Sequence, residues 1–294
     1  MKKKLVLIIS VIVIIILSGT YALFNFGAHL MKKPERSYPV FTYMERWQQL
    51  SEFSEYKDDN RKIPFTYELN QKEKYKELIN KYDLDSVVKG YDDVELMKVL
   101  LNWFCDNFKH NGSTGLPSKH DAITLTNHYK KHPDGINCRG VSIILAEILR
   151  AYGVPAKHIT CMPKEAVFDD CHVVVHAYSK KLNQWIMLDS TYRLILQNSK
   201  GDYINLPMLR EALINKDELI PNTNAGHNGE AFDINDYCEY MTKNTFRFMC
   251  ATDYYFGAEE GVGKNRKNIL VPVNYSDDIS KSNTTSDKAF WALP

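Results

Sequence analysis

Residues 135–157 read GINCRGVSIILAEILRAYGVPAK, and this stretch decides how the rest of the chain is organised. Its apolar side chains recur at helical spacing, which is typical of a helix with a broad buried face. Asn137 is a good N-cap residue, Gly153 is suited to ending a helix, and Pro155 prevents the helix from resuming. We therefore expect a largely apolar helix, central in its domain, with Cys138 in the first turn.

The position of Cys138 has chemical consequences. The first turn of a helix carries backbone N–H groups without intrahelical partners and a partial positive charge, and both stabilise a thiolate. A reactive thiol is therefore one interpretation. The other is a buried structural cysteine, because free cysteines are among the most buried residues in proteins. The helix alone leaves both open, and residues downstream must decide between them.

The composition is that of an ordinary globular protein. The chain has 294 residues, a formal net charge of +1, and 25% charged and 12% aromatic residues. A net charge close to zero, with no basic stripe interleaved with aromatic residues, argues against a nucleic-acid partner. The sequence contains neither internal repeats nor a glycine-rich phosphate loop. The length beyond the N-terminal segment allows one large domain or two small ones.

The N-terminus predicts a membrane anchor. Residues 5–26, LVLIISVIVIIILSGTYALFNF, are uncharged and long enough to span a bilayer as a helix. The lysines at residues 2–4 should remain in the cytoplasm, which places the rest of the chain outside. A cleaved signal peptide is the alternative, but residues 20–22 make a poor cleavage site. We expect residues 1–28 to be an uncleaved single-pass anchor in the cell membrane, with the following domain on the extracytoplasmic side.

Beyond the anchor, residues 29–62 look like a tether that includes some helix. Residues 63–294 are expected to form the domain, with a C-terminal extension. An extracytoplasmic domain can form disulfides, and the cysteines are Cys105, Cys138, Cys161, Cys171, Cys238 and Cys250. A nucleophilic Cys138 must stay free, and a domain of this size can build its own core. We therefore predict few or no disulfides.

The order of elements predicts an α+β fold. Helices come first, and the residue types that favour strands gather after Pro155. The helices are expected at Gln71–Tyr82, from Asp92 or Asp93 to about Phe108, and at Ala122–Lys130, ahead of the Cys138 helix. The strands are expected at His158–Met162, Cys171–Ser179 and Gln184–Asp189. Further on we expect a helix at Met208–Leu213, a helix running into a strand at Tyr237–Met249, and a strand at Ile269–Val273.

Two of these strands carry the residues that complete a thiol site. His172 and His176 share one face of their strand, because alternate side chains of a strand lie together. A hairpin turning near Leu182 brings Asp189 opposite the His172 end. A cysteine at a helix start, then a histidine and an aspartate on adjacent strands, is the arrangement for a thiol nucleophile. The imidazole takes the thiol proton, and the carboxylate fixes the tautomer of the imidazole.

Two stretches resemble a known family. NCRGVSIILAEILRAYGVPAK is similar to the cysteine-helix motif of the transglutaminase-like superfamily, and CHVVVHAYSKKLNQWIMLDST is similar to its histidine and aspartate motifs. The resemblance covers about Asp92 to Leu213. It implies a papain-like α+β core of a membrane-anchored bacterial type, in which a central helix packs on an antiparallel sheet. It also implies Cys138 as nucleophile, His172 as base and Asp189 as orienting residue.

The sequence departs from the family pattern at three positions near these residues. His176 stands where the family commonly has Glu, Ser190 where it has Pro, and Val174 where it often has an aromatic residue. Strand parity does not separate the two histidines, but matching the family motif favours His172 over His176 as the base. None of the departures replaces Cys138, His172 or Asp189.

We expect neither metal nor cofactor. Cys161, Cys171, His172 and His176 are zinc-ligand types. However, the two histidines would lie roughly 13 Å apart on one strand, at about 3.3 Å per residue, and could not share an ion.

The backbone N–H of Cys138 is one natural donor to an oxyanion. Asn137 and Trp103 are candidates for the second donor, although Asn137 also suits a helix cap and Trp103 also suits a core, so neither is assigned.

The sequence leaves two functional hypotheses. The first is an extracytoplasmic thiol enzyme that acts on amide bonds through an acyl-enzyme, which an amine or water then resolves. Its substrate would be a protein or peptide, with cell-envelope material among the candidates. The second is a non-catalytic surface module that keeps the same fold to bind peptide or cell-wall material. The separations among Cys138, His172 and Asp189 discriminate between them.

Overall fold

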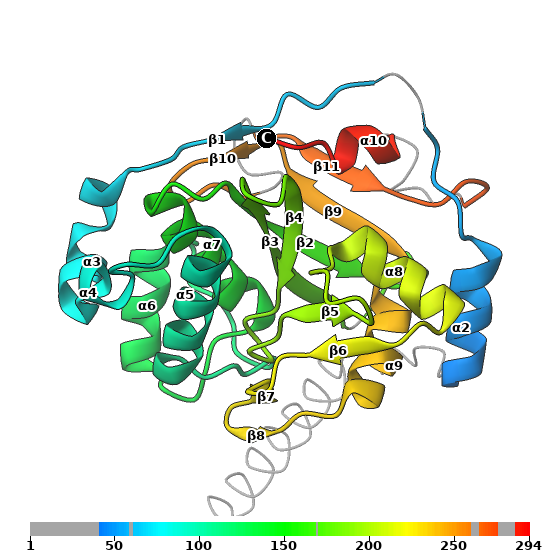
Figure 1. Cartoon of the computed structure of the whole chain (residues 1–294), viewed down its shortest axis with the longest axis horizontal. Helices are drawn as coiled ribbons and strands as arrows, with labels where there is room; N and C mark the ends of the chain where they lie inside the picture. The colour runs from blue at the N-terminus through cyan, green and yellow to red at the C-terminus, as the bar shows by residue number, and fades with distance from the viewer. Residues whose placement is uncertain (1–40, 59–60, 169, 260–264, 276–285) are drawn as a thin grey trace, which may run out of the picture. The chain divides into compact units, whose positions relative to one another are not determined.

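An antiparallel sheet of five strands carries the predicted site. The computed structural model describes residues 41–58, 61–168, 170–259, 265–275 and 286–294 (Figure 1). The strand order is β11-β9-β2-β3-β4, and every neighbouring pair is antiparallel. The strands are β2 (Ala156–Met162), β3 (His172–Ser179), β4 (Gln184–Leu188), β9 (Arg247–Ala251) and β11 (Lys267–Leu270).

Helix α7 (Cys138–Ala151) packs along one face of this sheet, against β2 and β3. It begins at Cys138, as expected, because the side chain of Asn137 accepts a hydrogen bond from the backbone N–H of Gly140 at 3.1 Å. All residues from Gly140 to Ala151 are buried. The helix is therefore held by packing along its whole length, which fixes the position of its first turn.

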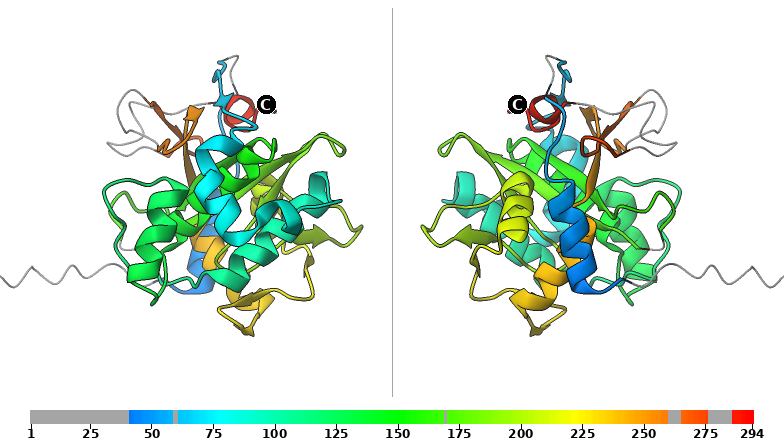
Figure 2. Two further views of the ribbon diagram at one scale, coloured as in Figure 1. Left: turned by 90° about the vertical axis from the view of Figure 1, so that its left-hand side faces the viewer. Right: turned by 90° about the vertical axis from the view of Figure 1, so that its right-hand side faces the viewer.

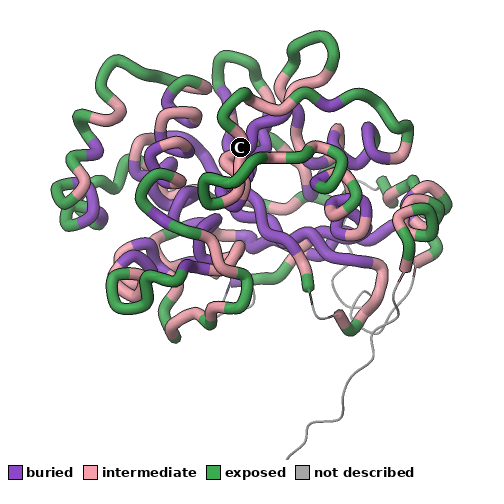
Figure 3. Tube along the Cα trace, turned by 90° about the horizontal axis from the view of Figure 1, so that it is seen from below, coloured by how far each residue is buried: buried purple, intermediate pink, exposed green. Residues whose placement is uncertain are grey.

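The two faces of the sheet belong to two separate apolar cores. Alternate β3 residues divide between them, with Val175 and Ala177 in the core on the α7 side and Val174 in the other. Figure 1 shows α5 (Asp93–Asn107) and α6 (Ala122–Lys131) beside α7 on the first side. The second side is covered by α2 (Tyr43–Glu52), α8 (Leu206–Asn215) and α9 (Ile234–Asn244). The buried segments run through the middle of this arrangement, between the exposed loops (Figure 3).

The remaining elements are short. The helical ones are a 3-10 turn, η1 (Lys72–Tyr75), then α3 (Lys76–Tyr82), α4 (Leu84–Val87) and α10 (Asp287–Phe290). The strands form three two-stranded pairs: β1 (Thr66–Tyr67) with β10 (Asp253–Tyr254), β5 (Leu196–Asn198) with β6 (Leu219–Pro221), and β7 (Gly226–His227) with β8 (Glu230–Ala231).

The α+β class and the antiparallel sheet are confirmed. The strands predicted after Pro155 occur as β2, β3 and β4. The expected C-terminal extension contributes two strands of the sheet, since β9 pairs with β2 and β11 pairs with β9.

The compact unit begins at Phe41, well before the boundary expected at residue 63. Helix α2 accounts for the difference, because it packs against α9 and α8 (Figure 2). In the described part of the chain, no helix combines the length and apolar character needed to cross a bilayer. The anchor predicted at residues 5–26 lies outside the described residues.

Candidate active site

Cys138 is the first residue of α7 and is half-buried. Its thiol donates a hydrogen bond to the backbone carbonyl of Cys171, with a sulfur–oxygen distance of 3.9 Å. A Cβ added at Gly140 would lie 2.4 Å from Cγ2 of Ile136 and 2.9 Å from Cδ2 of Leu116. A side chain at Gly140 would force Ile136 or Leu116 to shift, so glycine lets both side chains pack closely against the first turn.

His172 begins β3, and Asp189 directly follows β4. The Nε2 atom of His172 lies 2.7 Å from Oδ2 of Asp189, and the two side chains are 2% and 0% exposed. The same carboxylate accepts a hydrogen bond from the hydroxyl of Tyr237 at 3.0 Å and one from the backbone N–H of Thr191 at 2.9 Å. Three donors thus fix the carboxylate in one orientation, and the carboxylate fixes the imidazole.

The buried pair is held in its charged form. Burial alone would lower the pKa of His172, but the Asp189 carboxylate and the thiol of Cys138 outweigh burial and raise it to about 10. Burial would likewise raise the pKa of Asp189, but the His172 imidazolium and the hydrogen bonds from Thr191 and Tyr237 bring it below its ordinary range. Both shifts favour an imidazolium facing a carboxylate at neutral pH.

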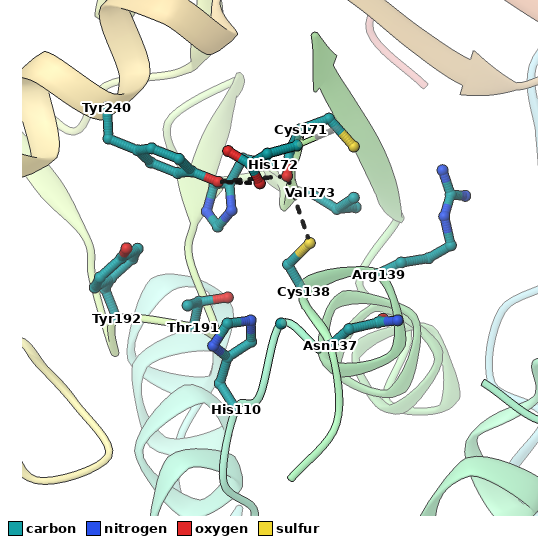
Figure 4. A pocket seen from close by; sticks show the side chains of 12 residues that line it. His110, Asn137, Cys138, Arg139, Cys171, His172, Val173, Thr191, Tyr192 and Tyr240 are labelled. Atoms are coloured by element: carbon teal, nitrogen blue, oxygen red, sulfur yellow. Dashed lines mark hydrogen bonds between the residues drawn. The ribbon is translucent and has the colours of Figure 1, made fainter. Parts of the chain in front are cut away.

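Cys138 and His172 open onto one pocket of about 260 Å³ (Figure 4). The aromatic rings of Tyr192 and Tyr240 lie against the imidazole of His172, with centroids 5.9 and 5.4 Å away. The pocket is lined by His110, Gly112, Asn137, Cys138, Arg139, Asp170, Cys171, His172, Val173, Thr191, Tyr192 and Tyr240.

Polar contacts fix the rim of this pocket. The hydroxyl of Tyr240 donates to the backbone carbonyl of Cys171 at 3.4 Å and to Asp170 at 3.2 Å, and Lys243 pairs with the same aspartate at 2.5 Å. Helix α9 therefore holds the segment that leads into His172. On the opposite side, the guanidinium of Arg139 donates to Thr160 at 2.9 Å.

His176 lies on the same face of β3 but has no part in the pocket. Its Nε2 accepts a hydrogen bond at 2.9 Å from the backbone N–H of Leu206, the first residue of α8. Its ring stacks on Trp185, with centroids 5.9 Å apart. Burial, together with the charge of Lys157, lowers the pKa of His176 well below its ordinary value. The structure thus brings Cys138, His172 and Asp189 together and places His176 in the core.

The candidates for an oxyanion donor are otherwise engaged. The side chain of Asn137 caps the helix and also donates to the backbone carbonyl of Thr114 at 2.9 Å. Trp103 packs in the core on the α7 side, among the rings of Tyr82, Phe104 and Phe108. Among the described residues, no group of three or more His, Cys, Asp or Glu side chains is placed to hold a metal ion.

The sequence reasoning missed His110, Tyr237 and Tyr240. His110 is in the segment HNGS, just beyond the helix expected to end at about Phe108, where we expected no site residue. The two tyrosines lie far along the chain, in a region for which we expected no site residue. The signal that could have found them is an aromatic pair at helical i, i+3 spacing in the stretch YCEY.

Comparison with known proteins agrees with the fold. Residues 84–190 match the model of the Transglutaminase-like superfamily, and this segment contains Cys138, His172 and Asp189. These residues thus form a transglutaminase-like core within the α+β fold. No curated protein matches the chain.

Solved structures match with low similarity. A candidate cysteine protease from Cytophaga hutchinsonii is 19% identical, with a TM-score of 0.33, over 59% of this chain and 57% of that one. A TGase crystal structure is 12% identical, with a TM-score of 0.28, over 58% of this chain and 37% of that one. A candidate protease from Parabacteroides distasonis is 12% identical, with a TM-score of 0.28, over 54% and 30%. The chain thus spans less than two thirds of the length of each.

Proposed function

We propose that this protein is a thiol acyl-transfer enzyme that acts on amide bonds. Cys138 is the nucleophile, His172 the general base and Asp189 the orienting residue. The observation that carries the proposal is the buried 2.7 Å contact between His172 and Asp189, together with the pocket that His172 and Cys138 both line. A buried ion pair is costly to maintain, and its position beside a thiol gives it a chemical use.

The groups of the pocket suit each step of acyl transfer. Nε2 of His172 is occupied by Asp189, so the other ring nitrogen, Nδ1, holds the proton taken from the Cys138 thiol, and the site rests as a thiolate beside an imidazolium. The thiolate sulfur bonds to the carbonyl carbon of the amide, and the carbonyl electrons move onto its oxygen. The intermediate then collapses, the C–N bond breaks, and His172 returns the proton to the leaving amine. Water or a second amine resolves the remaining thioester by the same steps in reverse.

The size of the pocket favours a protein or peptide substrate over a small molecule. Its volume of about 260 Å³ lies below the range of roughly 300–1,000 Å³ typical of small-molecule sites. A pocket of this size suits one inserted side chain, with the rest of the substrate lying outside. The flanking rings of Tyr192 and Tyr240 offer an apolar surface to the stem of such a side chain.

The departures from the family pattern favour the enzyme over a binding module. Val174 and His176 are fully buried and point into the core on the α8 side. Ser190 is buried as well, and it is not among the residues that line the pocket. A module that had replaced chemistry with binding would be expected to differ at the pocket surface. These three changes instead lie behind it.

The proposal places the domain on the extracytoplasmic side of the cell membrane, held by the anchor predicted at residues 1–28. The lysines at residues 2–4 and the uncharged run that follows support this orientation. Cell-envelope proteins and peptides are then the substrates within reach. The test is protease treatment of intact cells, which should cleave the domain. A domain that remains protected until the cells are lysed would overturn this orientation.

Thiol labelling tests the proposed nucleophile. Iodoacetamide at neutral pH should modify Cys138 first among the six cysteines, as read by peptide mapping. Cys138→Ala should abolish the fast phase. Cys171→Ala is the matched control, because Cys171 lies beside Cys138 and lines the same pocket, yet burial raises the pKa of its thiol to about 11. Labelling that spares Cys138, or that is spread evenly over the cysteines, would contradict the proposal.

A further inference from the structure

His110 lines the same pocket as Cys138 and His172, and the mechanism proposed above gives it no role. Figure 4 shows its ring below that of His172, with Cys138 beside both. Its Nδ1 lies 3.0 Å from Nε2 of His227. Its other nitrogen, Nε2, is buried and has no hydrogen-bond partner among the described residues. Because His110 lines the pocket, this unpaired nitrogen is placed to meet a group that enters the pocket.

The backbone around His110 is fixed by two sets of hydrogen bonds. On one side, residues 109–111 pair with Ile136: its N–H donates to the carbonyl of Lys109, and its carbonyl accepts from Asn111, both at 2.9 Å. On the other side, Asn228 accepts from the N–H of His110 at 2.8 Å and donates to its carbonyl at 2.9 Å. The imidazole is therefore tied both to the segment that starts α7 and to the β7–β8 hairpin.

Gly135 permits this approach of the two segments. Its φ is +135°, and an added Cβ would lie 2.5 Å from Cβ of Asn111 and 2.9 Å from the carbonyl carbon of His110. Any other residue at this position would push the His110 segment away from the start of α7. The close placement of His110 and Cys138 is thus built into the backbone.

The direction of the hydrogen bond between His110 and His227 determines which nitrogen of His110 carries the proton. Burial, with the nearby charges of His172 and His227, lowers the pKa of His110 to about 4, so its ring is neutral at neutral pH and carries one proton. When His227 donates from Nε2 to Nδ1 of His110, that proton must be on Nε2 of His110. A neutral imidazole can act as an electrophile toward a developing oxyanion without adding a positive charge in the ground state.

We propose that the Nε2–H of His110 is the second oxyanion donor of this site, acting with the backbone N–H of Cys138, and that His227 positions it by fixing its tautomer. The inference rests on the proposed function. When the thiolate adds to a carbonyl carbon, the negative oxygen forms beside the sulfur, inside the pocket that His110 lines. His110 meets it there with a donor already in place, so little reorganisation is needed during the reaction.

The test compares two reactions of the same sulfur in the full-length protein. Acetylation by p-nitrophenyl acetate forms the S–C bond through a tetrahedral oxyanion and releases p-nitrophenolate. Alkylation by iodoacetamide displaces iodide directly and forms no oxyanion. His110→Ala should slow acetylation by about 10²-fold, the typical cost of losing one such donor. It should change the alkylation rate by less than about twofold, because the thiolate and its imidazolium partner remain.

Further variants test the N–H donor of His110 and the role of His227 separately. His110→Gln keeps an N–H donor near the position of Nε2 and should recover at least about tenfold of the lost acetylation rate. His227→Phe keeps a ring but removes the donor to Nδ1. It should lower acetylation several-fold, and His227→Gln should restore the rate. The control is His132→Ala, an exposed histidine outside the pocket, which should leave both rates unchanged.

The outcomes separate this inference from the proposed function. Acetylation of His110→Ala within about threefold of wild type would overturn the inference. So would an equal loss of both reactions, which would place His110 in thiol activation or in the fold. A wild-type protein that alkylates selectively at Cys138 but is not acetylated would also overturn it. If Cys138 is not selectively alkylated in the wild type, the proposed function fails. Acetylation unaffected by His227→Phe would remove the role of His227.

Discussion

The two histidines of β3 are both buried, but their pKa values are shifted in opposite directions. His172 and His176 lie on one face of the same strand and are 2% and 0% exposed. At the end of the strand, Nε2 of His172 meets the carboxylate of Asp189. In the middle of the strand, Nε2 of His176 accepts a backbone N–H from Leu206. The pKa of His172 is raised and that of His176 is lowered.

The difference shows that the neighbours decide the role of a buried imidazole, whereas its strand position does not. Burial acts in the same direction on both rings, since it disfavours the charged form. At His172 a carboxylate reverses the effect. At His176 the charge of Lys157 adds to it, and the N–H of Leu206 requires a neutral acceptor. One end of the strand is therefore suited to moving protons, and the middle is suited to holding α8.

The largest expected effect is that of His172→Asn. Without an imidazole beside Cys138, the thiolate keeps only the stabilisation from the helix N-terminus. We expect the alkylation rate at neutral pH to fall by about 10²- to 10⁴-fold, the usual contribution of a positioned general base. Circular dichroism should show the fold retained. A fall of less than threefold in a folded variant would show that His172 does not activate the thiol of Cys138.

The second largest effect is expected for Asp189→Asn, in which the alkylation and acetylation rates should fall by at least about 10²-fold. The side chains are isosteric, so the packing should survive, but an amide can present its NH₂ group to the imidazole and favour the wrong tautomer. Rates measured beside circular dichroism spectra would check this. A folded variant with wild-type rates would show that the carboxylate is not used in thiol activation.

The same variant should change how stability depends on pH. The pKa of Asp189 lies below 3.8, so its stabilising contribution is present above that pH and is lost on acidification. The pKa of His172 is raised from 6.5 to about 10, so its contribution is complete below pH 6.5 and is lost as the pH rises through about 10. Urea unfolding at acid, neutral and alkaline pH should show both losses in wild type and smaller ones in Asp189→Asn. Equal profiles would contradict the charged pair.

The smallest effect on reactivity is expected for His176→Phe. The ring volume is kept, but the N–H of Leu206 loses its acceptor, which should lower the free energy of unfolding by about 1–3 kcal/mol. The alkylation rate of Cys138 should stay within about twofold of wild type. His176→Gln restores an acceptor and is the matched control for stability. Loss of alkylation in a folded His176→Phe protein would mean that His176 is needed to activate the thiol of Cys138.

Much of the central fold could be predicted because its signals are local. The capped apolar helix at Cys138 and the three strands after it have their periodicity within short windows. The hairpin predicted near Leu182 placed Asp189 opposite the His172 end, and the resemblance to the transglutaminase-like motifs joined Cys138 to this pair. Parity alone did not separate His172 from His176, because both side chains share a face. Their partners distinguish them: Asp189 for His172, and the backbone of α8 for His176.

The site residues that the sequence did not predict are held by contacts between segments that are far apart along the chain. Tyr237 reaches Asp189, and Tyr240 reaches Cys171, from a helix whose own sequence shows only an aromatic-rich amphipathic pattern. His110 follows a predicted helix without any signal of a site, and its place at the site follows from its pairing with Ile136 beside Gly135. Such pairings leave no periodic pattern in the sequence, because each joins residues that come together only when the tertiary structure forms.

The central claim is that Cys138 forms an acyl-enzyme with help from His172. The most direct measurement is peptide mapping of the full-length protein after brief exposure to p-nitrophenyl acetate at neutral pH. The account requires an acetyl group on Cys138 in the wild type and in His176→Phe, and at most a trace in His172→Asn. An acetyl group on another cysteine, or the same yield on Cys138 in both histidine variants, would contradict it.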